Sequence, residues 1–175
     1  MSVSLDFIWK YYEESFASLY AREEYYLNFD GYKNTLSQPE LKDFFDHARK
    51  ELEELVKFDF LSVDEGLIKD DFRNRVLNNP DKNPEFVRLS NIFKNKFDKI
   101  PYSSKSGDLC IIKAWKNVIA PDDVVIICNY ETALEFRNWF AHGRNWDLSP
   151  TTILSVMDVK HTVKNVLSIM NISIS

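Results

Sequence analysis

The chain has 175 residues, of which 45% are hydrophobic, and a formal net charge of −5. Its length predicts a single domain over residues 1–175 that can bury a core without disulfide or metal support. The acidic balance excludes an extensive nucleic-acid-coating surface, which needs an excess of Lys and Arg, but it leaves room for a small basic cleft.

Helices dominate the pattern along the chain. Four Gly and six Pro leave little material for tight hairpins, whereas plentiful Glu, Lys and Leu favour helices. Apolar residues recur at helical spacing in segments joined by short breaks. These segments are 4–28, 37–58, 62–77, 83–100, 108–119, 124–142 and 149–170. We therefore predict an all-α fold, an up-and-down helical bundle of about five main helices plus short ones.

The first predicted helix carries more aromatic side chains than one buried stripe requires. Its surplus lies on two faces and comprises Trp9, Tyr11, Tyr12, Tyr25 and Tyr26. One interpretation is that a partner subunit covers part of this helix. The other is a well-packed helix with half-exposed tyrosines.

Two Ser-x-x-Glu patterns mark predicted helix starts. Residues 37–40 and residues 62–65 each place a Ser three positions before a Glu, which is the form of a capping box. They predict two separate helices, the first of which ends near Phe58. His47 and Arg49 fall off the apolar stripe of that helix, and we expect both to be solvated.

A charged group follows in the second of these helices. Asp70 and Asp71 lie close to Arg73 and Arg75. Such a group forms either a solvated, ion-paired surface or a brace for a functional site elsewhere in the fold.

Several classes of protein are not supported by any motif. Cys110 and Cys128 lie in apolar surroundings without metal-ligand spacing, which predicts buried thiols in a reducing cytoplasm, with a disulfide as the alternative. The longest aliphatic run, 124–128, is far too short to cross a bilayer. The chain also lacks a metal-binding pattern, a Gly-x-Ser-x-Gly elbow and a Gly-rich phosphate loop. We expect no membrane association, no metal and no cofactor.

The stretch 134–146 is the part of the sequence that points to chemistry. It contains Arg137, Asn138 and His142. A guanidinium can clamp phosphate oxygens, an imidazole can transfer a proton, and the amide can hold one of them in place. On a helix Asn138 and His142 lie about 40° apart, whereas Arg137 and His142 lie about 140° apart. Gly143 is a natural left-handed stop, so we expect the helix to end at His142 and free the imidazole to turn toward Arg137.

This string resembles the signature of the HEPN superfamily (higher eukaryotes and prokaryotes nucleotide-binding domain). Residues 137–144 read Arg-Asn-Trp-Phe-Ala-His-Gly-Arg, and the family pattern is an Arg, four to six residues and a His, often with a polar residue after the Arg. The resemblance implies an all-helical domain and a metal-independent endoribonuclease of toxin–antitoxin or antiphage systems.

The resemblance also assigns roles. Arg137, Asn138 and His142 become the catalytic residues, and Arg144 becomes a second contact for the RNA substrate. One His per chain is few for two proton transfers, and the family's usual arrangement is a homodimer with a shared cleft. Some family toxins carry a Tyr two residues after the His, which a partner antitoxin modifies. This chain has Arg144 there, so neutralisation by that route is not supported, although an antitoxin or other regulatory protein is still expected.

Two functions and one structural interpretation remain open from the sequence. The chain is an endoribonuclease, or it is a non-catalytic HEPN module that binds nucleotide, RNA or a partner protein. In the structural interpretation, Arg137 pairs with a carboxylate and His142 caps a helix end.

Overall fold

The computed structural model describes residues 4–28, 36–77, 91, 107–117, 119–143 and 154–173. Within these ranges the chain is helical and contains no strand, which confirms the all-α prediction. The helices are α1 (Leu5–Asn28), α2 (Gln38–Leu77), α4 (Gly107–Lys116), the short 3-10 helix η2 (Pro121–Asp123), α5 (Val124–Ala141) and α6 (Val156–Ile169). The predicted helix over 83–100 and the loop that follows it lie almost entirely outside the described residues.

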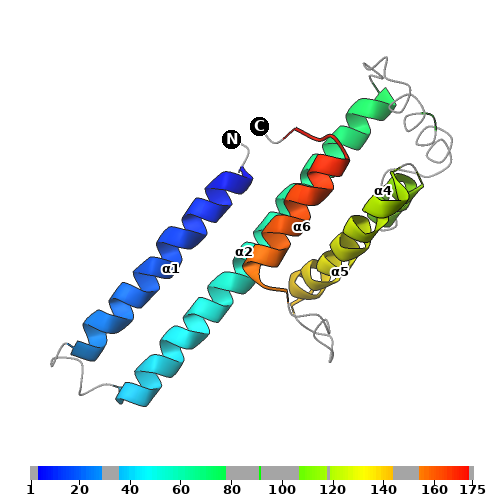
Figure 1. Cartoon of the computed structure of the whole chain (residues 1–175). Helices are drawn as coiled ribbons and strands as arrows, with labels where there is room; N and C mark the ends of the chain where they lie inside the picture. The colour runs from blue at the N-terminus through cyan, green and yellow to red at the C-terminus, as the bar shows by residue number, and fades with distance from the viewer. Residues whose placement is uncertain are drawn as a thin grey trace.

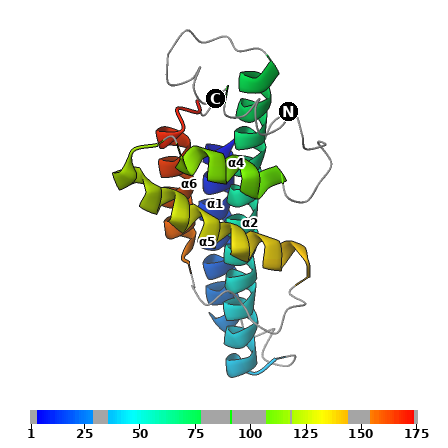
Figure 2. The same cartoon turned by 90° about the vertical axis from the view of Figure 1, so that its right-hand side faces the viewer.

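The long helix α2 is the centre of the arrangement. It contacts α1, α4, α5 and α6. Helix α1 runs antiparallel to α2, and α6 lies beside α2 and runs in the same direction (Figure 1). Helices α4 and α5 pass obliquely across this group (Figure 2). In both views α1 and α5 lie on opposite sides of α2.

The prediction of two helices over 37–58 and 62–77 is wrong, because the chain forms one helix of 40 residues across both. Residues 37–40 do form a capping box: the Ser37 N–H donates to Glu40 Oε2 at 2.8 Å. The similar pattern at 62–65 lies inside α2. The helix continues there because Phe60 and Leu61 are fully buried and no proline interrupts the backbone.

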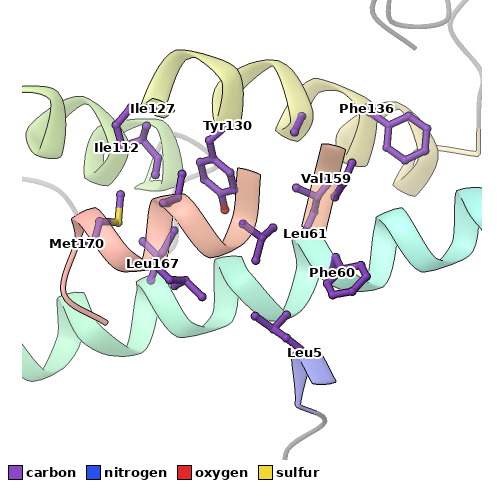
Figure 3. Close-up of a cluster of buried hydrophobic side chains, with 14 of the residues drawn as sticks. Leu5, Phe60, Leu61, Ile112, Ile127, Tyr130, Phe136, Val159, Leu167 and Met170 are labelled. Atoms are coloured by element: carbon purple, nitrogen blue, oxygen red, sulfur yellow. The ribbon is translucent and has the colours of Figure 1, made fainter. Parts of the chain in front are cut away.

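The core lies where α2, α5 and α6 meet. Leu61, Tyr130 and Val159 come from these three helices and point toward one another (Figure 3). Helix α6 contributes one continuous stripe, which was predicted from its spacing: Val156, Val159, Val163, Val166, Leu167 and Met170. The start of α6 differs from the prediction, since Ser155 caps the helix and accepts a hydrogen bond from the Asp158 N–H at 3.1 Å.

Two further expectations are corrected. Cys128 is exposed because it lies off the buried stripe of α5 that includes Ile127 and Tyr130. Arg49 is not solvated: it is 8% exposed, pairs with Glu23 of α1 and stacks over Tyr20 at 4.3 Å. The side chain of Cys110 lies outside the description. His161 is exposed on α6.

The exposed aromatic surplus lies mainly on α1. Its most exposed aromatic side chains are Phe7, Tyr11, Tyr20 and Tyr25, each more than half exposed. Within the described ranges, none of the helices is both long and apolar enough to span a membrane.

The burial of Leu61 predicts a large effect on stability. Leu61→Ala should lower the free energy of unfolding by about 2–5 kcal/mol, because it opens a cavity between α2 and its neighbours. Leu55→Ala is the matched control on the same helix, since Leu55 is 48% exposed and should cost less than about 1 kcal/mol. Chemical denaturation of both variants measures the difference, and equal effects would show that the centre of α2 is not the core.

Candidate functional site

The end of α5 has the form predicted from Gly143. The helix ends at Ala141, His142 is the C-cap residue, and Gly143 adopts a left-handed φ of 71°. The His142 N–H donates to the Asn138 carbonyl at 3.1 Å, and the Gly143 N–H donates to the Phe140 carbonyl at 3.0 Å. These bonds satisfy carbonyls that a helix end otherwise leaves open. His142 is consequently held at an exposed helix terminus.

Arg137 lies half-buried one turn and a half before this terminus. Its Nη1 donates to Asn138 Oδ1 at 2.9 Å, and its Nη2 forms an ion pair with Glu65 Oε2 of α2. Nε is buried and has no hydrogen-bond partner in the described structure. Burial lowers the pKa of Arg137, but a guanidinium remains protonated at any physiological pH. The site therefore has a permanent positive charge held in a defined position.

Glu65 is the residue of this site that the sequence analysis missed. Its second oxygen, Oε1, pairs with Lys69 one turn further along α2. In sequence, Glu65 occupies the last position of the Ser-x-x-Glu pattern, and that pattern suggested a local helix cap. Only the packing of α5 against α2 shows that Glu65 forms an ion pair with Arg137 and does not cap a helix. The sequence contains no local signal for this contact, because Glu65 lies 72 positions before Arg137.

Contacts from residues earlier in α2 fix the end of α5 in place. Phe58 packs on Phe140 with ring centroids 5.2 Å apart. Lys57 Nζ donates to the Leu154 carbonyl at 3.2 Å and lies 4.7 Å from the centroid of the Phe136 ring. Burial lowers the pKa of Lys57. Lys57 therefore joins α2 both to α5 and to the residue that precedes the α6 cap.

Asp64 is a second carboxyl group beside the site. It is completely buried where α2 faces α5. Burial raises the pKa of Asp64 to about 7, and the nearby Tyr130 acts in the opposite direction. Burial dominates because an isolated carboxylate loses its hydration in the core. Near neutral pH, Asp64 is consequently present in both protonation states.

The structure thus brings two of the predicted site residues together directly. Arg137 and Asn138 are hydrogen-bonded, while His142 lies on the exposed end of the same helix. Arg144 lies outside the described residues. The two features of the structural interpretation are also present, since Arg137 pairs with a carboxylate and His142 caps α5. Within the described ranges, no cluster of His, Cys, Asp or Glu has the form of a metal site.

Comparison with models of known protein families, with curated proteins and with solved structures gives no match. The membership in the HEPN superfamily stays a prediction that rests on residues 137–144.

The buried carboxyl of Asp64 predicts a pH-dependent stability. The pKa rises from 3.8 in the unfolded chain to about 7 in the folded one, so the folded state holds the proton more tightly. The stabilisation is complete below pH 4 and is lost as the pH rises through 7, by roughly 4 kcal/mol at most.

The variant Asp64→Asn keeps the shape of the neutral side chain and removes the titration. Urea unfolding of both proteins between pH 4 and pH 8 should show the wild type losing stability relative to the variant as the pH rises. A constant difference between the two across this range would contradict a raised pKa at Asp64.

Proposed function

We propose that this chain is a metal-independent endoribonuclease that acts on RNA in the cytoplasm. The observation that carries the proposal is the arrangement on α5: Arg137 is hydrogen-bonded to Asn138, and His142 is exposed at the end of the same helix. The resemblance of residues 137–144 to the HEPN signature supports the same function. It also supports a role as a toxin or antiphage effector under the control of an antitoxin or another regulatory protein.

The chemistry uses a nucleophile that RNA itself supplies. The 2′-oxygen attacks phosphorus, and the bond from phosphorus to the 5′-oxygen breaks. His142 takes the proton from the 2′-hydroxyl or gives one to the departing 5′-oxygen. Arg137 stabilises the charge of the phosphorane, and Asn138 orients the guanidinium. The products are a 2′,3′-cyclic phosphate and a 5′-hydroxyl, and DNA is not cleaved because it lacks the 2′-hydroxyl.

We infer that the second proton transfer uses His142 of a second copy of the chain. The exposed aromatic side chains of α1 are not suited to build that shared cleft, because α1 and α5 lie on opposite sides of α2 (Figure 1). A dimer that joins two His142 side chains instead requires contact at the terminus of α5.

A second function is favoured by one observation. The ion pair with Glu65 already neutralises Arg137, and such pairing suits a residue that stabilises the fold. In that case the chain is a non-catalytic module that binds nucleotide, RNA or a partner protein.

The nuclease proposal predicts cleavage of mixed RNA in the presence of EDTA. His142→Ala should reduce the rate by about 10²–10⁴, as expected for loss of an acid–base group. Arg137→Lys keeps the charge but loses the fork of donors, and should cost about 10²–10³. His161→Ala is the matched control, since His161 is an exposed His on α6, and its rate should equal that of the wild type.

A different result would favour the binding module. In that case the RNA stays intact with the wild type and with all three variants, although a direct binding measurement shows that the protein binds RNA at the concentration used.

The shared cleft predicts a dimer in solution. Light scattering of the wild type should give the mass of two chains of 20.6 kDa each. A mass of one chain, measured under conditions where RNA is cleaved, would overturn the dimer while leaving the nuclease in place.

A further inference from the structure

The face of α1 that points away from α2 carries a regular row of exposed residues. Helix α1 packs along one side of α2 and lies at the edge of the described structure (Figure 1). On its other side, exposed residues follow one another at alternating intervals of four and three positions. These residues, the outer stripe, are Phe7, Tyr11, Glu14, Ser18, Ala21, Tyr25 and Asn28. The three aromatic members are each more than half exposed.

This spacing is the spacing of a seam between two paired helices. Intervals of four and three average 3.5 residues, which keeps one row of side chains facing a second helix along its whole length. Leu5 and Ile8, which lie in the core, are on a different face of α1. We propose that the outer stripe packs against the outer stripe of a second copy of the chain. The two copies of α1 run antiparallel about a twofold axis level with residue 16.

The charges along α1 select the antiparallel direction. In a parallel pair Glu14 would face Glu14 of the other chain, and two carboxylates in the seam repel each other. In the antiparallel pair Glu14 faces Ser18, whose hydroxyl can donate a hydrogen bond to the carboxylate. Lys10 and Glu24 are exposed on one flank of the outer stripe. Antiparallel pairing places Lys10 of each chain beside Glu24 of the other, which forms two ion pairs.

The sizes of the side chains fit the same arrangement. Tyr11 faces Ala21, so that a large side chain meets a small one on each side of the twofold axis. Close to the axis, Ala17 of one chain lies beside Ala17 of the other, and these exposed small residues let the helices approach closely. Phe7 faces Tyr25 at both ends of the seam, and aromatic pairs stabilise a contact beyond the area they bury.

This contact is separate from the contact at the end of α5 that the proposed nuclease requires. Helix α1 and helix α5 lie on opposite sides of α2 (Figure 1), so one chain can use both surfaces. Dimers joined at α5 would then associate further through α1. By mass action, the mass in solution should rise with protein concentration, from two chains to four or more.

The test measures mass by light scattering over a range of protein concentrations. Tyr11→Glu places a carboxylate in the seam, where it would lose its hydration. This variant should therefore keep its lowest mass at every concentration, while the wild type should reach at least twice that mass. Val125→Glu is the matched control, because Val125 is an apolar residue of α5 that is 58% exposed, and it should associate like the wild type. Thermal unfolding of each variant checks that the fold is retained.

A charge exchange tests the direction of the pairing. Lys10→Glu and Glu24→Lys should each weaken the association through α1 about three- to tenfold, since each change turns two attractive pairs into repulsive ones. The double variant with both changes should recover the association of the wild type, because the ion pairs form again with their signs reversed. A parallel pair would show no such recovery.

The outcomes decide this inference independently of the proposed function. Equal masses of the wild type and Tyr11→Glu at all concentrations, or a double variant that associates no better than the single ones, would overturn the pairing through α1. The lowest mass of Tyr11→Glu reports on α5: two chains agree with the dimer of the proposed nuclease, and one chain refutes that dimer. In both cases the ratio of the wild-type mass to that of the variant decides the pairing through α1.

Discussion

The burial of the middle of α2 is the constraint on which the rest of the structure depends. Phe60 and Leu61 lie in the core, and α5 and α6 pack against them. Ending the helix before Ser62 would place open backbone carbonyls and N–H groups in this apolar region, which is costly. The helix therefore continues to Leu77. Continuation places Asp64 in the interior and directs Glu65 to Arg137.

The charged groups around the site follow from this packing. A half-buried guanidinium is costly without a partner, and the carboxylate of Glu65 offsets that cost. Such pairing also fixes the direction of Arg137, and a guanidinium has further N–H donors besides those bound to Glu65 and Asn138. The contact that stabilises α5 against α2 is therefore compatible with a contact to phosphate. The ion pair between Arg137 and Glu65 therefore stabilises the packing of α5 on α2 and also orients the guanidinium for the proposed chemistry.

The position of α1 limits how the proposed site can be completed. From the sequence, the aromatic surplus of this helix was open to two interpretations, a covered interface or half-exposed side chains. In the structure Tyr11 and Tyr25 are more than half exposed, whereas Trp9, Tyr12 and Tyr26 are partly buried. Helix α1 lies on the side of α2 away from α5 (Figure 1). The exposed aromatic side chains of α1 and the proposed site on α5 thus belong to different helices of this fold.

The sequence by itself determined what local spacing controls. The helical stripe of α6, the start of α5 at Val124 and its end at the left-handed Gly143 were all predicted correctly, because each depends on neighbours within one or two turns. The hydrogen bond between Arg137 and Asn138 is also local, but the sequence left open which group the Asn138 amide would hold. What only the tertiary structure decided involves residues distant in sequence: the continuity of α2, the burial of Arg49 and the contact between Glu65 and Arg137. A Ser-x-x-Glu pattern is the same string at a helix start and inside a helix, and the free energy of burying the surrounding residues decides between them.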